Sequence, residues 1–339
     1  MPAEAMGLVA ALEERFLVPV CTSRHARRWV TGHRALSWPL LLRGGDVAWY
    51  TAPSDAGPVR VATVGGRKRF DEWLARLNAV PEDAAPSRRS LREPTALDGL
   101  EADLLLAHVH RWAAESFRRA GWQTVPSAVR WQAAAADVPP SRPRRSLRSD
   151  LTLIERLGYE HELGASAADW AEFYDAMVEP EAQARFAARA WLPSTHLRRD
   201  FAARGTLHFV RLEGVRVAGC CTLPTASGVW IPVSGVRGGD PELFAKRAGS
   251  AALAAAFRWA RANGARSIDL GRTTPFLGDG VAWVKEKWGF HPVAEPLAHL
   301  VAVRARPGSA PALALLRQHP VRVETAAGLD ALGVPDAAH

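Results

Sequence analysis

The chain has 339 residues, 48% hydrophobic and 23% charged, so it is long enough for about two globular domains and is not a disordered chain. Its formal net charge of +8 favours polyanionic partners, namely nucleic acid, nucleotide phosphates or an anionic membrane face, without choosing among them. Three cysteines with no C-x-x-C spacing exclude a disulfide framework and fit a reducing, cytoplasmic location.

The N-terminus predicts no signal peptide, because it is acidic rather than basic and has no apolar core after it. No apolar run approaches the roughly 20 residues of a membrane-spanning helix. Helices are predicted over 3–15 and 23–35. Short apolar runs separated by glycine and proline then indicate an antiparallel meander, with strands at 38–42, 47–51 and 59–64.

The rest of the first half predicts a helix over 68–78, a loop over 79–94 and a long helix over 97–119. Asp137–Arg145 (DVPPSRPRR) is the clearest internal boundary, because its prolines do not fit a regular helix. This stretch is either a charged linker or a contact for an anion.

The second half alternates helices and strands. Helices are predicted over 147–157, 167–178, 182–203 (broken near Pro193), 242–262 and 281–288, and near the C-terminus. Strands are predicted over 206–212, 215–223, 229–236, 267–270 and 297–304. Cys220 and Cys221 are adjacent on one of these strands, so their side chains should point to opposite faces.

Lysine is rare in this chain. Only four of its 43 basic residues are lysines, and Lys246, Lys285 and Lys287 fall within one short window. Lysine approaches a single oxygen end-on and its pKa shifts readily, whereas arginine is a fixed planar cation. The window therefore indicates chemistry or phosphate binding, unless these lysines lie on exposed helices by chance.

The turn before the long helix reads Lys246-Arg247-Ala248-Gly249-Ser250-Ala251. Small residues at a helix start allow backbone N–H groups to approach phosphate oxygens, and the helix dipole and the two cations favour an anion there. The alternative is a helix whose small residues pack against a sheet. The predicted helix, 242–262, also begins before this motif.

These motifs resemble the GNAT acyltransferase superfamily. The turn is similar to its [R/Q]-x-x-G-x-[G/A] loop, with Lys246 in the first position. Residues 267–290 (SIDLGRTTPFLGDGVAWVKEKWGF) resemble the signature of FemAB-type aminoacyl transferases and their BioF2-like relatives. Val284 stands where that family often has phenylalanine, Lys285 falls on its lysine and Trp288-Gly289 on its Trp-Gly.

The resemblance covers about residues 146–305 and includes Ser146–Gly158 and Phe173–Tyr174. It implies an α/β (α+β) fold of two GNAT-like lobes, each a mixed, mostly antiparallel sheet flanked by helices, with the second better formed. The expected domains are an N-terminal lobe (1–145), an acyltransferase lobe (146–305) and a C-terminal helix and tail (306–339).

The resemblance also implies site roles. Lys285 would stabilise the tetrahedral intermediate or bind the donor's phosphate, and open α/β sheets place ligands at strand carboxyl ends such as this one. Asp279 is either the N-cap of the short helix or a catalytic base or anchor. The remaining expected catalytic residue is Arg272. Expected to bind the donor are Lys246, Arg247, Gly249, Ser250 and Ala251. Expected to bind substrate are Asp269, Thr273, Thr274, Lys287 and Trp288.

Most of these residues also have a structural alternative. Asp269 either orients Arg272 or caps the turn, and Thr273 and Thr274 bind either substrate or the loop backbone. Lys287 is either functional or an exposed charge. Glu179 and Glu181, on either side of Pro180, meet an amine substrate or have no such role.

No nucleophile elbow, Walker loop, H-E-x-x-H or dinucleotide motif is present in the sequence, which favours direct transfer without a covalent enzyme intermediate. His208, His291 and His299 lack metal-ligand spacing, and no metal or tightly bound cofactor is expected.

The favoured hypothesis is transfer of an aminoacyl group from aminoacyl-tRNA to a small-molecule or peptide amine, a cell-wall precursor or secondary metabolite. The alternative is an acyl-CoA-dependent N-acetyltransferase. A third reading is a nucleic-acid-binding protein without catalysis.

Overall fold

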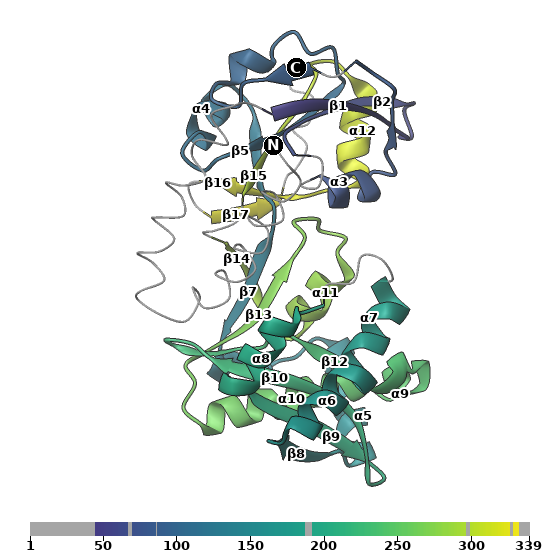
Figure 1. The fold of residues 1–339 in the computed structure, drawn as a ribbon, viewed down its shortest axis with the longest axis vertical. Coiled ribbons are helices and arrows are strands. Elements are labelled where there is room, and N and C mark those ends of the chain that lie inside the picture. The colour runs from purple at the N-terminus through teal and green to yellow at the C-terminus, as the bar shows by residue number, and fades with distance from the viewer. Residues whose placement is uncertain are drawn as a thin grey trace. The chain divides into compact units, whose positions relative to one another are not determined.

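A computed structural model describes residues 45–66, 70–85, 87–186, 192–295, 299–325 and 328–331 (Figure 1). These residues form two compact units that alternate along the chain. The first unit contains Trp131–Gly271 and Val284–His291. The second contains the described residues up to Arg130, Arg272–Trp283 and those from Pro292 onward. The chain thus enters the first unit at Trp131, whereas the predicted boundary follows residue 145.

Some predictions lie outside the described residues, namely the helices at 3–15 and 23–35, the strand at 38–42 and the end of the tail. Among the residues that the structure describes, no helix is both long and apolar enough to cross a bilayer.

The second unit is built on a sheet with the strand order β3-β1-β2-β5-β15-β6, and β4 also pairs with β1. Its strands are β1 (Gly45–Ala52), β2 (Val59–Val64), β3 (Val80–Pro81), β4 (Ser87–Arg89), β5 (Leu104–Val109), β6 (Gln123–Pro126) and β15 (Leu300–Ala305). β2 and β5 run parallel, whereas the pairs β1–β2, β1–β3, β1–β4, β5–β15 and β6–β15 are antiparallel. The meander strands predicted at 47–51 and 59–64 are confirmed as β1 and β2.

Helices cover both faces of this sheet. Leu104 and Leu106 of β5 join the core under α3 (Asp71–Arg76) and α12 (Ala310–Gln318), whereas Leu105 and Ala107 join the core under α4 (Ala114–Arg119). Successive strand residues point to opposite faces, so a strand with apolar residues on both faces serves both layers. The remaining elements of this unit are η2 (Pro94–Leu97), β16 (Arg322–Thr325) and β17 (Gly328–Ala331).

The long helix predicted over 97–119 is wrong. The chain there forms η2, strand β5 and the short helix α4. All six residues of β5 are buried and all but His108 are apolar, and periodicity alone does not separate such a run from a buried helix. The predicted loop over 79–94 contains the short strands β3 and β4.

The first unit is built on a sheet with the order β14-β7-β13-β11-β10-β9-β8, and β12 pairs with β10. Its strands are β7 (Val129–Ala134), β8 (Glu160–Gly164), β9 (Thr206–Leu212), β10 (Val215–Pro224), β11 (Gly228–Trp230), β12 (Ser234–Val236), β13 (Ser267–Thr273) and β14 (His291–Ala294). Its helices are η3 (Ala135–Asp137), α5 (Arg145–Leu157), α6 (Ala167–Glu172), the π-helix η4 (Phe173–Val178), α7 (Glu179–Phe186), α8 (Thr195–Arg204), η6 (Arg237–Gly239), α9 (Pro241–Ala245), α10 (Ala248–Ala262) and α11 (Gly280–Lys287).

Two helical layers cover this sheet as well. On one face, Cys221 of β10 packs in a core with Phe173 of η4 and Phe201 of α8. On the other face, the Cys220 thiol lies 3.6 Å from the Ala252 carbonyl oxygen of α10. The prediction that these two cysteines point to opposite faces is therefore confirmed, and burial raises the pKa of the Cys220 thiol to about 12.

Two predicted helices of this unit are subdivided. The helix predicted over 167–178 is α6 followed by the π-helix η4, a form that frequently marks functional sites. The helix predicted over 242–262 breaks at Lys246 and Arg247, so the single-helix prediction is wrong. Arg247 has a left-handed backbone (φ 65°), and α10 begins at the residue after it.

The two sheets repeat one strand plan. In each, two parallel strands are joined through a helix: β2–α3–β5 in the second unit and β11–α10–β13 in the first. In each, a strand from the other half of the chain is inserted beside this pair: β15 lies between β5 and β6, and β7 lies between β13 and β14. The expected fold class, two lobes with mixed and mostly antiparallel sheets flanked by helices, is confirmed.

Candidate donor and acceptor sites

The parallel pairing of β11 with β13 is short, and the next strand, β12, pairs with β10 instead of continuing along β13. Gly228, Val229 and Trp230 pair with Ser267, Ile268 and Asp269, and the Ile231 N–H donates to the Asp269 carbonyl at 2.8 Å. Beyond this point Ser234–Val236 pair with β10. The carboxyl end of β12 therefore diverges from β13, and ligands of open α/β sheets bind at such strand ends.

The chain returns from β12 to β13 through α10, whose start carries the predicted donor-binding residues. Lys246 and Arg247 are exposed, Gly249 and Ser250 are half-buried and Ala251 is buried. A Cβ atom on Gly249 would lie 3.3 Å from Cγ2 of Val236, so α10 begins directly beside the end of β12. The correction of the helix start thus places the predicted motif on the first turn of a helix.

Asp150 of α5 holds two of the predicted cations. Its Oδ1 accepts from Nε of Arg247 at 2.8 Å, and its Oδ2 accepts from Nζ of Lys287 at 2.5 Å. The Asp150 side chain is 7% exposed and that of Lys287 is 10% exposed. Lys287 is therefore not the exposed solvent charge that one alternative expected, because a buried carboxylate binds it.

The last backbone donor of β12 is occupied by a side chain. The Val236 N–H donates to Oε2 of Glu181 at 2.8 Å, and Oε1 of Glu181 accepts from Arg185 at 2.7 Å. A Cβ atom on Gly235 would lie 2.6 Å from the carbonyl carbon of Met177, so the backbone of η4 is in direct contact with β12. Glu181 thus has a defined position at the divergence, where it binds the backbone of β12, and its contact with an amine substrate stays a prediction.

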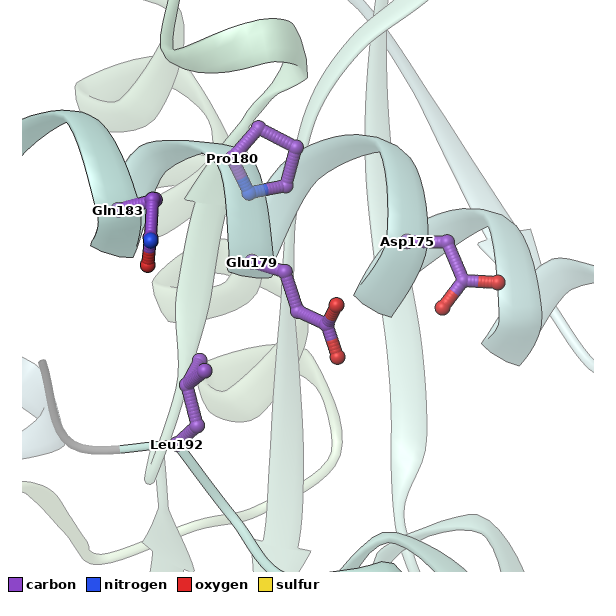
Figure 2. A pocket seen from close by; sticks show the side chains of 5 residues that line it. All are labelled: Asp175, Glu179, Pro180, Gln183 and Leu192. Carbon is purple, nitrogen blue, oxygen red and sulfur yellow. The ribbon is translucent and has the colours of Figure 1, made fainter.

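A pocket of about 390 Å³ lies beside α7 (Figure 2). It is lined by Asp175, Glu179, Pro180, Gln183 and Leu192. The two carboxylates come from adjacent helical turns, and Oε1 of Glu179 accepts from Nη2 of Arg198 at 2.5 Å. Two carboxylates against one arginine leave this pocket with one net negative charge, which favours a cationic ligand.

Lys285 is buried, with 7% of its surface exposed, and it belongs to the first unit. Its carbonyl oxygen accepts the N–H groups of Trp288 and Phe290, each at 3.1 Å. A nitrogen in this setting is held within the protein rather than in open solvent. Its proposed contact with a donor remains a prediction.

The Trp-Gly-Phe part of the signature is a packing anchor. Trp288 has no exposed surface, and its ring meets Phe257 of α10 edge-on at 5.3 Å, so it has no surface to offer a substrate in this structure. Gly289 has φ 89°, and a Cβ atom there would lie 3.2 Å from Pro140. The signature therefore fixes α11 against α10.

Asp269 binds the backbone within β13. Its Oδ1 accepts the Gly271 N–H at 2.7 Å, and its Oδ2 accepts from Gln132 at 3.2 Å. Arg272, in the second unit, forms its ion pair with the buried Glu295 at 3.0 Å. The two alternatives for Asp269, orienting Arg272 or capping a turn, stay predictions.

Asp279 is the N-cap of α11, as one alternative predicted. Its Oδ1 accepts the N–H groups of Val281 and Ala282 at 2.8 and 3.1 Å, and its Oδ2 accepts the Thr274 hydroxyl at 2.6 Å. The Thr273 hydroxyl donates to the Thr274 carbonyl at 3.0 Å. These side chains satisfy the loop backbone.

The predicted site is divided between the two units. Lys246, Arg247, Gly249, Ser250, Ala251, Asp269, Lys285, Lys287 and Trp288 belong to the first unit, whereas Arg272, Thr273, Thr274 and Asp279 belong to the second. Within the first unit, the structure brings Arg247 and Lys287 together on Asp150. No role was predicted for Asp150. Its position between Leu147 and Ile154, on the apolar face of an amphipathic helix, indicates a buried carboxylate that needs a cationic partner.

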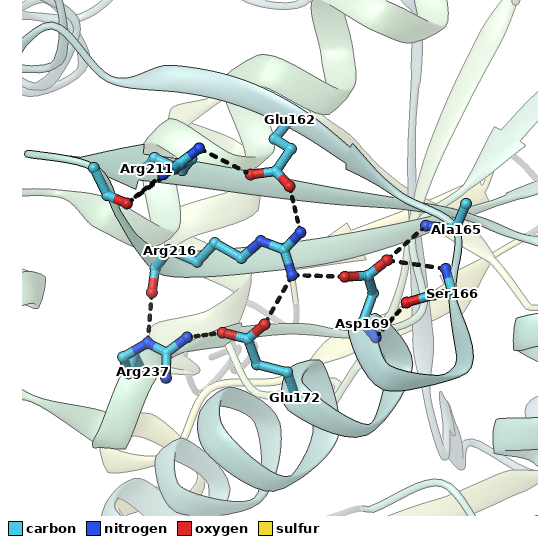
Figure 3. A network of polar contacts seen from close by, with 9 residues as sticks. Glu162, Ala165, Ser166, Asp169, Glu172, Arg211, Arg216 and Arg237 are labelled. Carbon is cyan, nitrogen blue, oxygen red and sulfur yellow. Dashed lines mark hydrogen bonds and ion pairs between the residues drawn. The ribbon is translucent and has the colours of Figure 1, made fainter.

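An arginine network fixes the start of the pocket helices to the sheet (Figure 3). Arg216 of β10 bonds to the carboxylates of Glu162, Asp169 and Glu172, with the Asp169 contact at 2.7 Å. Arg237 also bonds to Glu172. The hydrogen bond from Arg216 lowers the pKa of Glu162, and hydrogen bonds from Ser166 and Arg216 lower that of Asp169.

The histidines are structural in their observed contacts. Nδ1 of the fully buried His208 lies 3.1 Å from Nε2 of His161, and its Nε2 lies 3.0 Å from the Thr222 hydroxyl. Burial, and then the neighbouring His161, lower the pKa of His208 to about 3. Within the described residues, no group of three or more His, Cys, Asp or Glu side chains is placed to hold a metal ion.

Residues 141–279 match the family model of the acetyltransferase (GNAT) domain. No curated protein matches the chain. Among solved structures, it is similar to L-PGS from Bacillus licheniformis (14% identity, 79% of this chain and 87% of that chain, TM-score 0.40) and to FemX (12%, 75% and 88%, 0.41). It is also similar to a GCN5-related N-acetyltransferase from Sphaerobacter thermophilus (16%, 72% and 71%, 0.33). TM-scores this low support no statement about activity.

Proposed function

We propose that this chain, an acyltransferase with a GNAT domain, transfers an aminoacyl group from aminoacyl-tRNA to the amine of a small molecule or peptide. The amine attacks the ester carbonyl carbon, a C–N bond forms, and the C–O bond to the terminal ribose of the tRNA breaks. The proton lost by the amine ends on that ribose oxygen. The absence of a nucleophile motif in the sequence supports this direct attack.

The observation that carries the choice of donor is the hydrogen bond from the Val236 N–H to Glu181. A thioester donor has an extended, amide-bearing arm, and such an arm binds a diverging strand by pairing with its backbone. At the end of β12, Glu181 already accepts the hydrogen bond of the Val236 N–H, so this N–H group is not available to pair with such an arm. An ester-linked donor does not depend on strand pairing, because its phosphates and its carbonyl are the groups to be recognised.

The cationic side chains are proposed to bind the acyl donor, and the pocket beside α7 is proposed to bind the acceptor amine. Arg247 and the first turn of α10 favour a phosphate, and Lys285 is proposed to bind the carbonyl oxygen as charge develops on it. Asp175 and Glu179 favour an ammonium group, and a carboxylate there accepts the proton that the attacking amine must lose. The acceptor pocket is one helix away from β12, because α7 contributes both Glu179 and Glu181.

The acyl-CoA-dependent alternative keeps one supporting observation, namely the small-residue start of α10 beside β12. Thermal unfolding separates the two donors. A ligand at 100 times its Kd adds about 2.7 kcal/mol of stability. We expect no shift with millimolar CoA and release of label from bulk aminoacyl-tRNA when a small-molecule cell extract supplies the acceptor.

The variant Glu181→Ala sharpens this test, because it frees the Val236 N–H. We expect CoA to stabilise the variant more than the wild type, while Arg199→Ala, on the exposed side of α8, serves as the control. Strong stabilisation of the wild type by CoA, together with inert aminoacyl-tRNA, would assign the chain to the acyl-CoA-dependent class instead.

A further inference from the structure

The start of α5 is an exposed surface of unpaired arginines. Arg142, Arg144, Arg145 and Arg148 are all exposed. Among the described residues, the structure gives no acidic partner to Arg142, Arg144 or Arg145. The Arg148 guanidinium donates to the Pro143 carbonyl oxygen at 3.5 Å. We call these four residues the α5 arginine surface.

This arrangement is unfavourable for the isolated protein. A helix N-terminus carries a partial positive charge, so acidic residues there are stabilising and basic residues are not. The first turn of α5 contains no acidic residue, and its N-cap, Arg144, makes no side-chain capping bond. The repulsion among these cations is relieved when an anion with several charges binds to them.

The α5 arginine surface is connected to the donor site through α5 itself. Asp150 lies five residues after Arg145, about 7.5 Å along the helix axis, and it bonds directly to Arg247 and Lys287. The Tyr159 hydroxyl, just beyond the C-terminus of α5, donates to the Lys246 carbonyl at 3.0 Å. The middle of α5 and the residue just beyond its C-terminus are therefore bonded to residues around the start of α10.

We propose that the α5 arginine surface docks the phosphate backbone of RNA and leads its 3′ end to the start of α10. This inference rests on the proposed function, because it supplies the binding surface for the tRNA. Successive phosphates of one strand of double-stranded DNA rise about 3.4 Å along the axis, and a nucleic-acid backbone with a comparable spacing places two to three phosphates along the roughly 7.5 Å from Arg145 to Asp150. Arginine suits such contacts, because its planar fork pairs with phosphate oxygens in a bidentate way.

An anionic membrane is the competing partner. A membrane-binding surface combines basic residues with exposed apolar side chains that enter the interface. The large apolar side chains that are exposed in the described part of the chain are Val80, Trp112, Leu163, Val215 and Trp283. None of them belongs to residues 139–158, so the α5 arginine surface offers positive charge without apolar side chains that could enter a membrane. Such a surface suits a phosphate backbone better than a membrane.

The test compares two triple variants of the full chain. The first is Arg144→Gln, Arg145→Gln and Arg148→Gln. The matched control is Arg156→Gln, Arg199→Gln and Arg261→Gln, three exposed arginines elsewhere in the same unit, which changes the net charge equally. Binding of bulk deacylated tRNA is measured by fluorescence anisotropy over a series of salt concentrations.

Each lost phosphate contact lowers the slope of log K against log salt by roughly 0.7–0.9. We expect the first variant to lose about two units of slope and at least tenfold in affinity, whereas the control keeps the wild-type slope. Equal slopes for the two variants would overturn the inference.

Two outcomes separate this inference from the function on which it rests. If the wild type transfers label from aminoacyl-tRNA and the first variant does so equally well, the proposed function stands and the docking surface is wrong. If the wild type binds no tRNA, but binds phosphatidylglycerol vesicles in a way that only the first variant loses, the surface serves a membrane and both proposals fall.

Discussion

The carboxylate of Asp150 lies 2.5 Å from the ammonium group of Lys287, although the two residues are 137 positions apart in the chain. The same carboxylate binds Arg247, so one acidic side chain joins α5, the start of α10 and the end of α11. The rare lysines of the chain therefore have different roles. Lys287 holds the scaffold of the donor site, and Lys285 remains the candidate for chemistry.

Replacing Asp150 with asparagine should destabilise the first unit. The change leaves the ammonium of Lys287 buried without its counter-charge, and breaking a buried pair in this way costs roughly 3 kcal/mol or more. Urea unfolding at pH 7 measures the loss. The double variant Asp150→Asn/Lys287→Met should recover much of it, whereas Asp200→Asn, which breaks the partly exposed pair with Arg204, should cost less than about 1 kcal/mol. An unchanged unfolding midpoint for Asp150→Asn would show that the pair contributes nothing.

Lys285→Met should lower the rate of transfer by at least roughly 100-fold, which is typical of losing one group that stabilises the developing oxyanion. Methionine fills a similar volume, which matters because Lys285 is buried. The initial rate with labelled aminoacyl-tRNA is compared with the melting temperature of the same preparation. Wild-type turnover by a folded Lys285→Met protein would remove Lys285 from the mechanism and would favour the non-catalytic reading.

Arg216→Met should cost roughly 2–3 kcal/mol at pH 7, because three carboxylates lose a shared cation. The pKa values of Glu162 and Asp169 are lowered in the folded protein, so this stabilisation is present above their ordinary values and is lost as the pH falls. The difference between variant and wild type should therefore narrow below about pH 4.5. Urea unfolding from pH 7 to pH 3.5 tests this, and a difference that stays constant with pH would contradict it.

His208 should make the fold sensitive to mild acid. Its pKa is about 3 in the folded protein and 6.5 in the unfolded chain, so below pH 6.5 the unfolded chain binds the proton more readily. Stability should fall by up to about 1.4 kcal/mol per pH unit between these values. His208→Gln should flatten this dependence, and His196→Gln, exposed on α8, should not. An identical slope for the wild type and His208→Gln would rule out the effect.

Much of the first unit was predictable, because its signals are local. β9 matches its predicted range, α5 begins two residues before its predicted start and ends where expected, and the helix predicted over 182–203 is divided near Pro193. The first unit also carries the residues that resemble a known family. The cap was one of two alternatives for Asp279, because an acidic residue directly before a short helix commonly serves as its N-cap.

The errors lie where burial removes the periodic signal or where long-range contacts decide. β5 is buried on both faces although its sequence predicts a helix, and the left-handed Arg247 interrupts a stretch that is otherwise rich in alanine. The partners of Lys287, Val236 and Glu179 come from distant elements. No local pattern states that Asp150, Glu181 or Arg198 would meet them, because those contacts depend on the packing of whole helices.

The inserted strand β15 has a consequence for synthesis on the ribosome. β5 and β6 emerge early, with β6 ending at Pro126, but the strand that lies between them begins only at Leu300. Until then two strand edges stay unpaired, and such edges associate readily with other nascent chains. Cells that make this protein rapidly should therefore depend on chaperones to shield its first half until translation ends.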